Sequence, residues 1–124
     1  MPVQILIVDD NSSIRNLLRQ HFETQTGWRV CGEAANGKEG IEKAQALSPD
    51  LIILDLSMPV LNGLEAARIL NRQMPHVAIV MFTSFTTPVL EDELLGAGVH
   101  RIVSKSASLS ELTECARSLL KEAA

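Results

Sequence analysis

The segment Leu51-Ile52-Ile53-Leu54-Asp55-Leu56-Ser57-Met58-Pro59 decides the fold that we predict for this chain. Its first four residues are apolar, too few for a helix, and proline-containing pairs bound the segment on both sides. These features predict a strand buried on both faces, which is typical of a parallel sheet covered by helices. Asp55 then lies at the carboxyl end of the strand, where open α/β sheets bind ligands. A carboxylate in that position needs a cation or hydrogen bonds, because burying an unpaired charge is unfavourable.

Four other strands are predicted from runs of similar length. Two of them are predicted at the centre of the sheet, beside the strand that leads to Asp55, because one is apolar throughout and the other contains a single polar residue, Gln4. The other two carry polar residues within or around them, which favours positions at the edges. In chain order, the predicted strands span residues 3–8, 28–34, 51–55, 77–82 and 101–104.

A segment with helical spacing of apolar residues follows each predicted strand. In the first of these segments, Ile14, Leu17, Leu18 and Phe22 recur at a spacing that places them on one face of a helix. Asn-x-x-Glu patterns, such as the one that begins at Asn62, are typical of helix starts. The alternation predicts an α/β fold of the (βα)5 type, a single domain over residues 1–124. With three apolar strands at the centre, it fits the flavodoxin-like three-layer sandwich with parallel strand order 2-1-3-4-5.

Composition and charge argue against several classes of protein. Of 124 residues, 46% are hydrophobic and 21% charged, which indicates one globular domain with a buried core. No apolar run approaches the roughly 20 residues of a membrane helix, and the net charge of −4 argues against direct nucleic-acid binding. The N-terminus leads directly into a predicted strand, so we expect no signal peptide and a cytoplasmic protein. His21, His76 and His100 lack partners at metal-ligand spacing and are predicted at the surface.

Polar residues follow four of the predicted strands and would meet at one rim of the sheet. They are Asp9, Asp10, Asp55, Thr83 and Lys105. Three carboxylates placed together repel one another, and a hard divalent cation with oxygen ligands, Mg²⁺ above all, relieves that repulsion. A metal, an ammonium and a hydroxyl around one remaining carboxylate suit phosphoryl transfer, with Asp55 as the nucleophile.

Each of these residues also has a simpler interpretation. Asp9 or Asp10 alone is typical of a helix cap, and Asp55 alone could cap the segment that follows it. Thr83 with Ser84 is typical of a turn, and Lys105 of a solvated surface charge. The functional interpretation is favoured because the simpler ones require five coincidences on one rim of the sheet.

These motifs resemble those of the response-regulator receiver domain, the CheY-like family, over the whole chain. The matching features are the acidic pair in Ile7-Val8-Asp9-Asp10-Asn11, the run from Leu54 to Gly63, then Thr83-Ser84 and Lys105, in the family's order and at similar spacing. The run from Leu54 to Gly63 is the most specific of them. The run from Asp55 to Ala66 is most similar to receivers that precede a LuxR/NarL-type helix-turn-helix.

The resemblance implies a role for each residue of the rim. Asp55 would accept a phosphoryl group from a histidine kinase, a phosphotransfer protein or a small phosphodonor. Asp9 and Asp10 would hold Mg²⁺ together with Asp55 and the backbone carbonyl of Ser57. Thr83 would hydrogen-bond the phosphoryl oxygens and shift on activation, and Lys105 would form an ion pair with them. The domain would promote its own phosphorylation and dephosphorylation without being a separate enzyme.

The resemblance also implies where the signal leaves the domain. In the family this is the fourth helix, fifth strand and fifth helix, here about residues 88–120. A phosphorylation-dependent dimer through this face and a DNA-binding output domain beyond these 124 residues are further implications. The domain itself would bind neither nucleic acid nor membrane, and its output would be the control of transcription.

Ile102 departs from the family's pattern, and two other positions bear on the phosphoryl lifetime. The position three residues before Lys105 often carries Tyr or Phe, whose ring moves on activation, but here it is Ile102, and the chain has no Tyr. Ser57 and Phe85 occupy the positions that tune the phosphoryl lifetime in the family. We expect the bulky Phe85 to restrict the attacking water and to lengthen that lifetime.

Three competing interpretations use the same residues. A haloacid-dehalogenase-like phosphatase would have a second Asp where Ser57 stands. A flavodoxin or dinucleotide binder would need a phosphate-binding loop after the first strand, where Asp9 and Asp10 would repel a phosphate. A receiver-like binding module that works without phosphorylation is the remaining alternative, and Ile102 is the feature that leaves it open.

Overall fold

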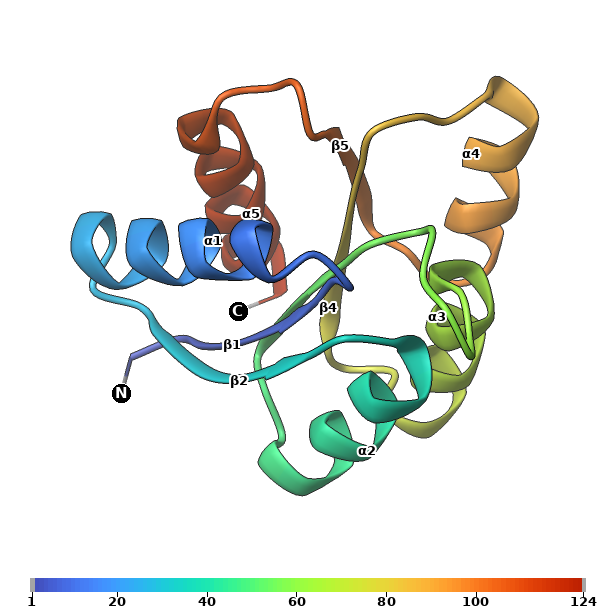
Figure 1. The fold of residues 1–124 in the computed structure, drawn as a ribbon, viewed down its shortest axis with the longest axis horizontal. Helices are drawn as coiled ribbons and strands as arrows, with labels where there is room; N and C mark the ends of the chain where they lie inside the picture. The colour runs from blue at the N-terminus through green and yellow to red at the C-terminus, as the bar shows by residue number, and fades with distance from the viewer. Residues whose placement is uncertain (1, 124) are drawn as a thin grey trace.

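Five strands and five helices alternate along the chain in the computed structural model, which describes residues 2–123 (Figure 1). The strands are β1 (Gln4–Val8), β2 (Arg29–Ala34), β3 (Leu51–Leu54), β4 (Ala78–Thr83) and β5 (Arg101–Ser104). The helices are α1 (Ser12–Gln25), α2 (Gly37–Leu47), α3 (Gly63–Gln73), α4 (Pro88–Gly96) and α5 (Leu109–Ala123). The predicted (βα)5 alternation is therefore confirmed.

The strands form one parallel sheet in the order β2-β1-β3-β4-β5. This is the predicted order, with the two more polar strands at the edges. Val8 pairs with Leu54, and Leu54 in turn pairs with Met81, so three central strands end at nearly the same level. Residues that directly follow these strands are therefore brought to one rim.

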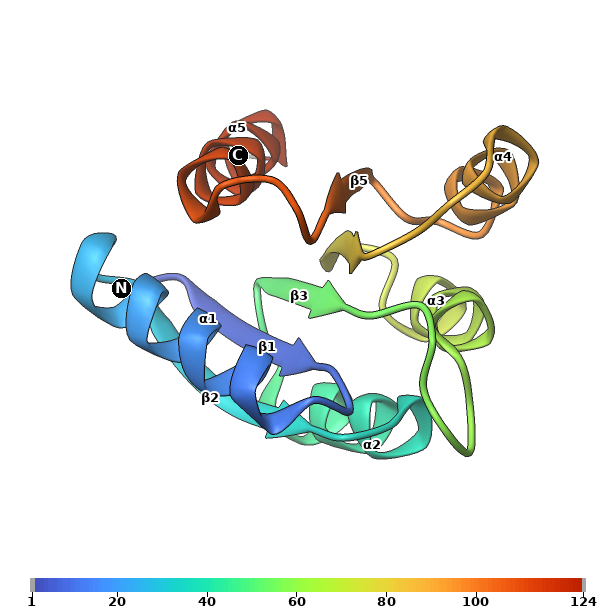
Figure 2. The same ribbon diagram turned by 45° about the horizontal axis from the view of Figure 1, so that its top comes forward.

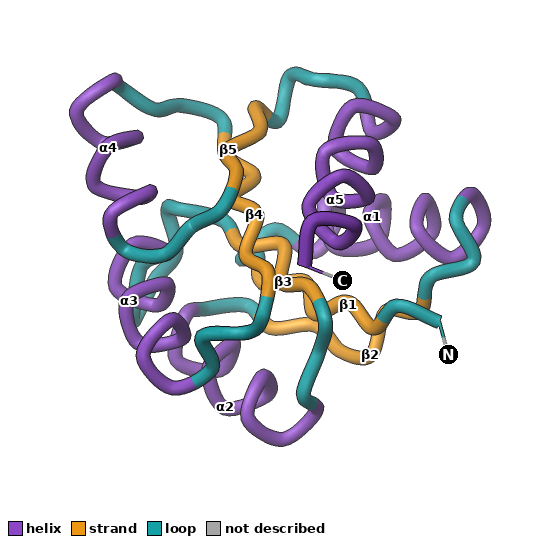
Figure 3. The backbone as a smooth tube through the Cα atoms, turned by 180° about the vertical axis from the view of Figure 1, so that it is seen from behind, coloured by secondary structure: helices purple, strands orange, loops and turns teal. Residues whose placement is uncertain are grey.

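The sheet separates two hydrophobic cores. Helices α2, α3 and α4 cover one face and α1 and α5 cover the other, as Figures 2 and 3 show from two directions, and their side chains build one core on each face. Alternate residues along a strand face opposite sides, so both cores draw on each central strand. In β3, for example, Ile52 and Leu54 belong to the first core, whereas Leu51 and Ile53 belong to the second.

Asparagine side chains begin three of the five helices, as the sequence pattern predicted for two of them. The side chain of Asn36 accepts a hydrogen bond from the backbone N–H of Glu39, at 2.9 Å, and that of Asn62 from Glu65, at 3.0 Å. Asn11 caps α1 in the same way and accepts hydrogen bonds from Ser13 and Ile14. An Asn cap satisfies backbone donors that the first turn of a helix leaves unpaired.

Two expectations about individual side chains were wrong. Leu17 is 49% exposed, because at 100° per residue it lies at the margin of the apolar stripe that Leu18 and Phe22 centre. His21 and His100 are partly buried, not on the surface. A ring nitrogen of His21 lies 2.7 Å from the Thr113 hydroxyl, and Nδ1 of His100 accepts a hydrogen bond from the backbone of Ile79. Within residues 2–123, no helix has the length and apolarity needed to cross a bilayer.

Candidate functional site

Three aspartates converge at the carboxyl end of the sheet. Carboxylate oxygens of Asp9, Asp10 and Asp55 all lie within 4.8 Å of one another. Asp9 and Asp55 are only 3% and 5% exposed, whereas Asp10 faces solvent. The register explains this cluster, because Asp9 follows β1 and Asp55 follows β3 at positions whose preceding residues are paired.

Backbone hydrogen bonds hold the two buried carboxylates in place. The Oδ1 atom of Asp9 accepts a hydrogen bond from the backbone N–H of Asn11, at 2.9 Å. The Oδ1 atom of Asp55 accepts one from the N–H of Leu56, also at 2.9 Å. The backbone N–H of Asp55 donates to the carbonyl of Val8, so the sheet ladder continues into the site. Hydrogen bonds to a carboxylate favour its charged form and partly offset the cost of burial.

Lys105 supplies the positive charge of the site. Its Nζ atom lies 2.9 Å from Asp9 Oδ2 and 3.3 Å from Asp55 Oδ1. The Lys105 side chain is 17% exposed, so this bridge is largely removed from solvent. The backbone N–H of Lys105 donates to the carbonyl of Thr83 and extends the β4–β5 pairing by one residue. This bond fixes the Lys105 backbone beside the end of β4, from where its side chain reaches Asp9 and Asp55.

The electrostatic environment shifts two pKa values at the site. Burial, and then the charge of Asp9, raise the pKa of Asp55 above its usual range despite the opposing effect of Lys105. For Lys105, burial lowers the pKa, but the hydrogen bond to Asp9 and the charge of Asp55 outweigh it and leave the pKa raised. The site therefore contains one firmly protonated ammonium and a carboxylate under repulsion.

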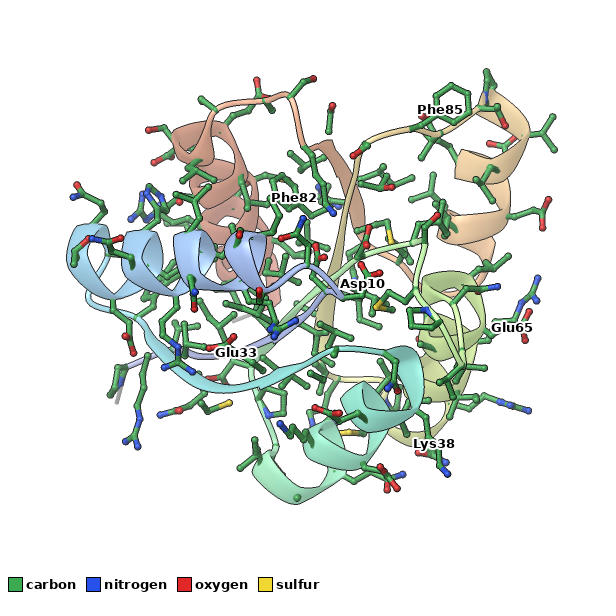
Figure 4. The ribbon with its side chains drawn as sticks, viewed as in Figure 1. Asp10, Glu33, Lys38, Glu65, Phe82 and Phe85 are labelled. Atoms are coloured by element: carbon green, nitrogen blue, oxygen red, sulfur yellow. The ribbon has the colours of Figure 1, made fainter. Side chains whose placement is uncertain are left out.

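Three of the four remaining predicted residues line an open pocket of about 460 Å³ that Asp10 and Asp55 also line. Thr83 is buried at the end of β4 and lines this pocket, together with Ser57. Phe85 also lines it, but its side chain is 73% exposed, on the segment before α4 and well away from Asp10 (Figure 4). Ile102 is partly buried and packs against the core that contains α4. The structure thus brings together Asp9, Asp10, Asp55, Ser57, Thr83 and Lys105, and leaves Phe85 at the margin and Ile102 beneath.

The donor set fits a hard divalent cation. Three carboxylates at this separation offer anionic oxygen ligands, which Mg²⁺ prefers, and neither sulfur nor imidazole belongs to the cluster. One ammonium is shared between two of these carboxylates, so net negative charge remains for a cation to neutralise. The geometry supports a site where a cation and a lysine flank one buried carboxylate.

A search against protein-family models matches residues 5–117 to the response regulator receiver domain. The chain belongs to this family. The response regulator protein VraR of Staphylococcus saprophyticus is 36% identical over 117 residues, which are 94% of this chain and 56% of that protein. The receiver thus spans little more than half the length of this curated relative.

Solved structures agree with this assignment. A LuxR-family two-component response regulator from Aurantimonas superimposes with a TM-score of 0.92 at 27% identity, over 98% of this chain and 87% of that one. A CheY-like receiver domain protein from Methanospirillum hungatei gives a TM-score of 0.93 at 25% identity, over 99% and 97% of the two chains. The flavodoxin-like fold and the resemblance identified from the sequence are both confirmed.

Sequence reasoning missed Arg15, which contacts the Asp9–Asp10 turn (the acidic turn), and Glu33, which binds Arg15. Arg15 on α1 donates a hydrogen bond to the backbone carbonyl of Asp9, at 2.7 Å, and another to the Glu33 carboxylate on β2, at 3.0 Å. A charged residue on an amphipathic helix or an edge strand usually faces solvent, so neither Arg15 nor Glu33 was predicted to belong to the site. The only available signal was that Glu33 lies one residue before the end of a strand neighbouring Asp9.

Proposed function

We propose that Asp55 is the phosphoacceptor of a two-component signalling pathway and that Mg²⁺ assists its phosphorylation. The observation that carries this proposal is the convergence of three aspartates within 4.8 Å, with Lys105 bridging Asp9 and Asp55. A receiver whose acceptor, acidic pair and lysine are all in place retains the groups that phosphoryl transfer needs. The donors would be a histidine kinase, a phosphotransfer protein or a small phosphodonor.

In the transfer step, a carboxylate oxygen of Asp55 attacks the phosphorus of a phosphohistidine. A P–O bond forms, the P–N bond breaks, and the imidazole leaves with the electron pair of that bond. The Lys105 ammonium lies beside Asp55 and compensates the charge of the phosphoryl oxygens. Thr83, which lines the same pocket, would donate a hydrogen bond from its hydroxyl to one of these oxygens.

Asp9, Asp10 and Asp55 would hold the Mg²⁺ ion together with the backbone carbonyl of Ser57. Bound there, the ion would neutralise charge on the transferring phosphoryl group. Asp9 is suited to an unchanging ligand role, because the Asn11 N–H and Lys105 already orient its carboxylate. Asp10 is exposed to solvent and would complete the carboxylate ligands of the ion.

Phosphorylation would act as a local change of charge that biases the face formed by residues 88–120. Thr83 links the site to this face, because its carbonyl accepts the Lys105 N–H at the end of β5. Control of transcription through an output domain outside these residues is the expected result, with a phosphorylation-dependent dimer as the mode of assembly. A cytoplasmic location, and activity as a switch and not as a separate enzyme, complete the proposal.

The direct test is intact-mass measurement after incubation with acetyl phosphate and Mg²⁺. We expect a gain of one phosphoryl group in the wild type and none in Asp55→Asn or in wild type treated with chelator. Asp92→Asn, an exposed aspartate on α4, is the matched control and should gain the group. A gain that persists in Asp55→Asn would place the acceptor elsewhere.

No gain with acetyl phosphate or with a panel of histidine kinases would favour the binding module that works without phosphorylation. That alternative predicts binding to an output partner that Asp55→Asn leaves unchanged. Comparing partner binding by the wild type and Asp55→Asn, each with and without phosphodonor, distinguishes the two functions.

A further inference from the structure

Arg15 connects the backbone carbonyl of Asp9 to a charged cluster centred on Glu33 of β2. Its Nη1 atom donates to the carbonyl of Asp9, at 2.7 Å, and its Nε atom donates to Glu33 Oε1, at 3.0 Å. The Arg15 and Glu33 side chains are only 19% and 24% exposed. A planar guanidinium with two fixed partners holds both at a defined separation, which a flexible ammonium does less well.

Glu33 is itself held by side chains from two helices, α1 and α2. Its second carboxylate oxygen accepts a hydrogen bond from Nε of Arg19 on α1, at 2.7 Å. Its backbone carbonyl accepts one from the Lys43 ammonium on α2. Burial would raise the pKa of Glu33, but hydrogen bonds and charge from Arg19, and then from Arg15, lower it below its usual range. Glu33, labelled in Figure 4, is therefore a fixed anion against which Arg15 is oriented.

The turn that Arg15 contacts carries two of the three aspartates of the site. The Asp9 N–H donates to the carbonyl of Ala34, and Asp9 Oδ1 accepts from Asn11, so Arg15 satisfies the remaining backbone group of Asp9. Mg²⁺ requires nearly ideal octahedral geometry, and small errors in ligand position lower its affinity. Groups that orient metal ligands are worth about 10- to 100-fold in metal affinity.

We propose that Arg15, anchored by Glu33, is a positioning residue that sets the Asp9–Asp10 turn for binding of a divalent cation. This inference rests on the proposed function, because it assumes that the three aspartates hold Mg²⁺. Simple electrostatics predicts the opposite effect. A guanidinium near the carboxylates repels a cation, so removing it would tighten Mg²⁺ binding if charge alone mattered.

The test measures the Kd for Mg²⁺ alone by calorimetry or by amide chemical shifts, with no phosphodonor present. We expect Arg15→Met to raise the Kd about tenfold, with Arg15→Lys regaining part of the loss because it keeps one donor and the charge. Arg19→Met is the matched control. It removes the same charge one turn along α1 and one bond to Glu33, but no bond to Asp9, so its Kd should rise clearly less than that of Arg15→Met.

Thermal unfolding without Mg²⁺ accompanies each variant, and Arg15→Lys carries the test if Arg15→Met does not fold. An unchanged or lower Kd in Arg15→Met or, failing that, in Arg15→Lys would overturn the inference, as would an equal rise in Arg19→Met. Failure of the proposed function is distinguishable, because the wild type itself would then show no Mg²⁺ binding. The Mg²⁺ concentration for half-maximal phosphorylation should rise by the same factor as the Kd.

Discussion

Lys105 lies closer to Asp9 than to the proposed phosphoacceptor: its Nζ atom is 2.9 Å from Asp9 Oδ2 and 3.3 Å from Asp55 Oδ1. The lysine is therefore bonded mainly to a residue that we propose as a metal ligand. Phosphorylation of Asp55 would place new anionic oxygens near the same ammonium, which would then divide its bonds between Asp9 and the phosphoryl group.

The first prediction concerns loss of this lysine. Lys105→Met leaves Asp9 and Asp55 buried without their shared cation, so the free energy of unfolding without Mg²⁺ should fall by about 2 kcal/mol. This is less than the roughly 3–5 kcal/mol of a fully buried broken pair, because Lys105 keeps some exposure. Urea unfolding measures the change, with Lys38→Met on the exposed surface of α2 as control. Equal stability of the wild type and Lys105→Met would show that the ion pair contributes nothing.

The second prediction reverses the sign of a common expectation about active-site mutants. Asp55→Asn removes a carboxylate whose pKa is raised by burial and by Asp9, so without metal it should increase the free energy of unfolding, on the order of 1 kcal/mol. Saturating Mg²⁺ should stabilise the wild type by about 2.7 kcal/mol at 100 times its Kd, and Asp55→Asn by less. Melting both proteins with and without Mg²⁺ checks this crossover. A wild type that is the more stable of the two in chelator would contradict it.

The third prediction is a pH dependence that comes from Glu33. Because the folded-state pKa of Glu33 lies below its usual range, its stabilisation is present above the pKa of the unfolded chain and is lost as pH falls through the folded value. Glu33→Gln should therefore lower the free energy of unfolding by about 1 kcal/mol near neutral pH. The difference should disappear as pH is lowered from about 7 to about 3. Glu42→Gln, exposed on α2, should show no such trend in urea titrations at matched pH.

The fourth prediction concerns the lifetime of the phosphorylated state. Phe85→Ala should accelerate loss of the phosphoryl group, but by no more than about threefold, or ~0.65 kcal/mol of barrier. The effect is small because the ring is 73% exposed and covers the pocket only at its margin. Val89→Ala is the matched control, since Val89 is 71% exposed and does not line the pocket. Slower decay in Phe85→Ala, followed by intact mass over time, would exclude a shielding role.

The sheet and the rim could be predicted from sequence because both depend on short, local signals. A four-residue apolar run such as Leu51–Leu54 defines a buried strand, and the parallel order brings its following residue, Asp55, to a known end of the sheet. The prediction that Leu17 is buried was wrong, because apolar spacing alone does not distinguish the centre of a helix's apolar stripe from its margin. The prediction that His100 lies at the surface was wrong, because its hydrogen-bond partner, the backbone N–H of Ile79, comes beside it only when β4 and β5 pair.

Arg15 and Glu33 could not be predicted for a related reason. Their bond joins α1 to an edge strand, and the register of β1 against β2 shifts between Ile5 and Leu6. Sequence periodicity does not report such a bulge, so it could not indicate which β2 side chain would lie opposite α1. The contacts between elements, such as that of Arg15 with Glu33, thus could not be predicted from the sequence. The residues that follow the strand ends could be.

Because the two cores lie on opposite faces of the sheet, a displacement in one core reaches the other through the strands between them. Helices α4 and α5 are neighbours in sequence, yet they are anchored in different compartments and share no packed interior. Strand β5 touches both, since consecutive residues Ile102 and Val103 point into the two compartments. Rotation of the backbone of this edge strand would therefore displace side chains in both cores at once. With Ile102 in place of an aromatic ring, a tilt of β5 would loosen the side-chain packing of one core and tighten that of the other.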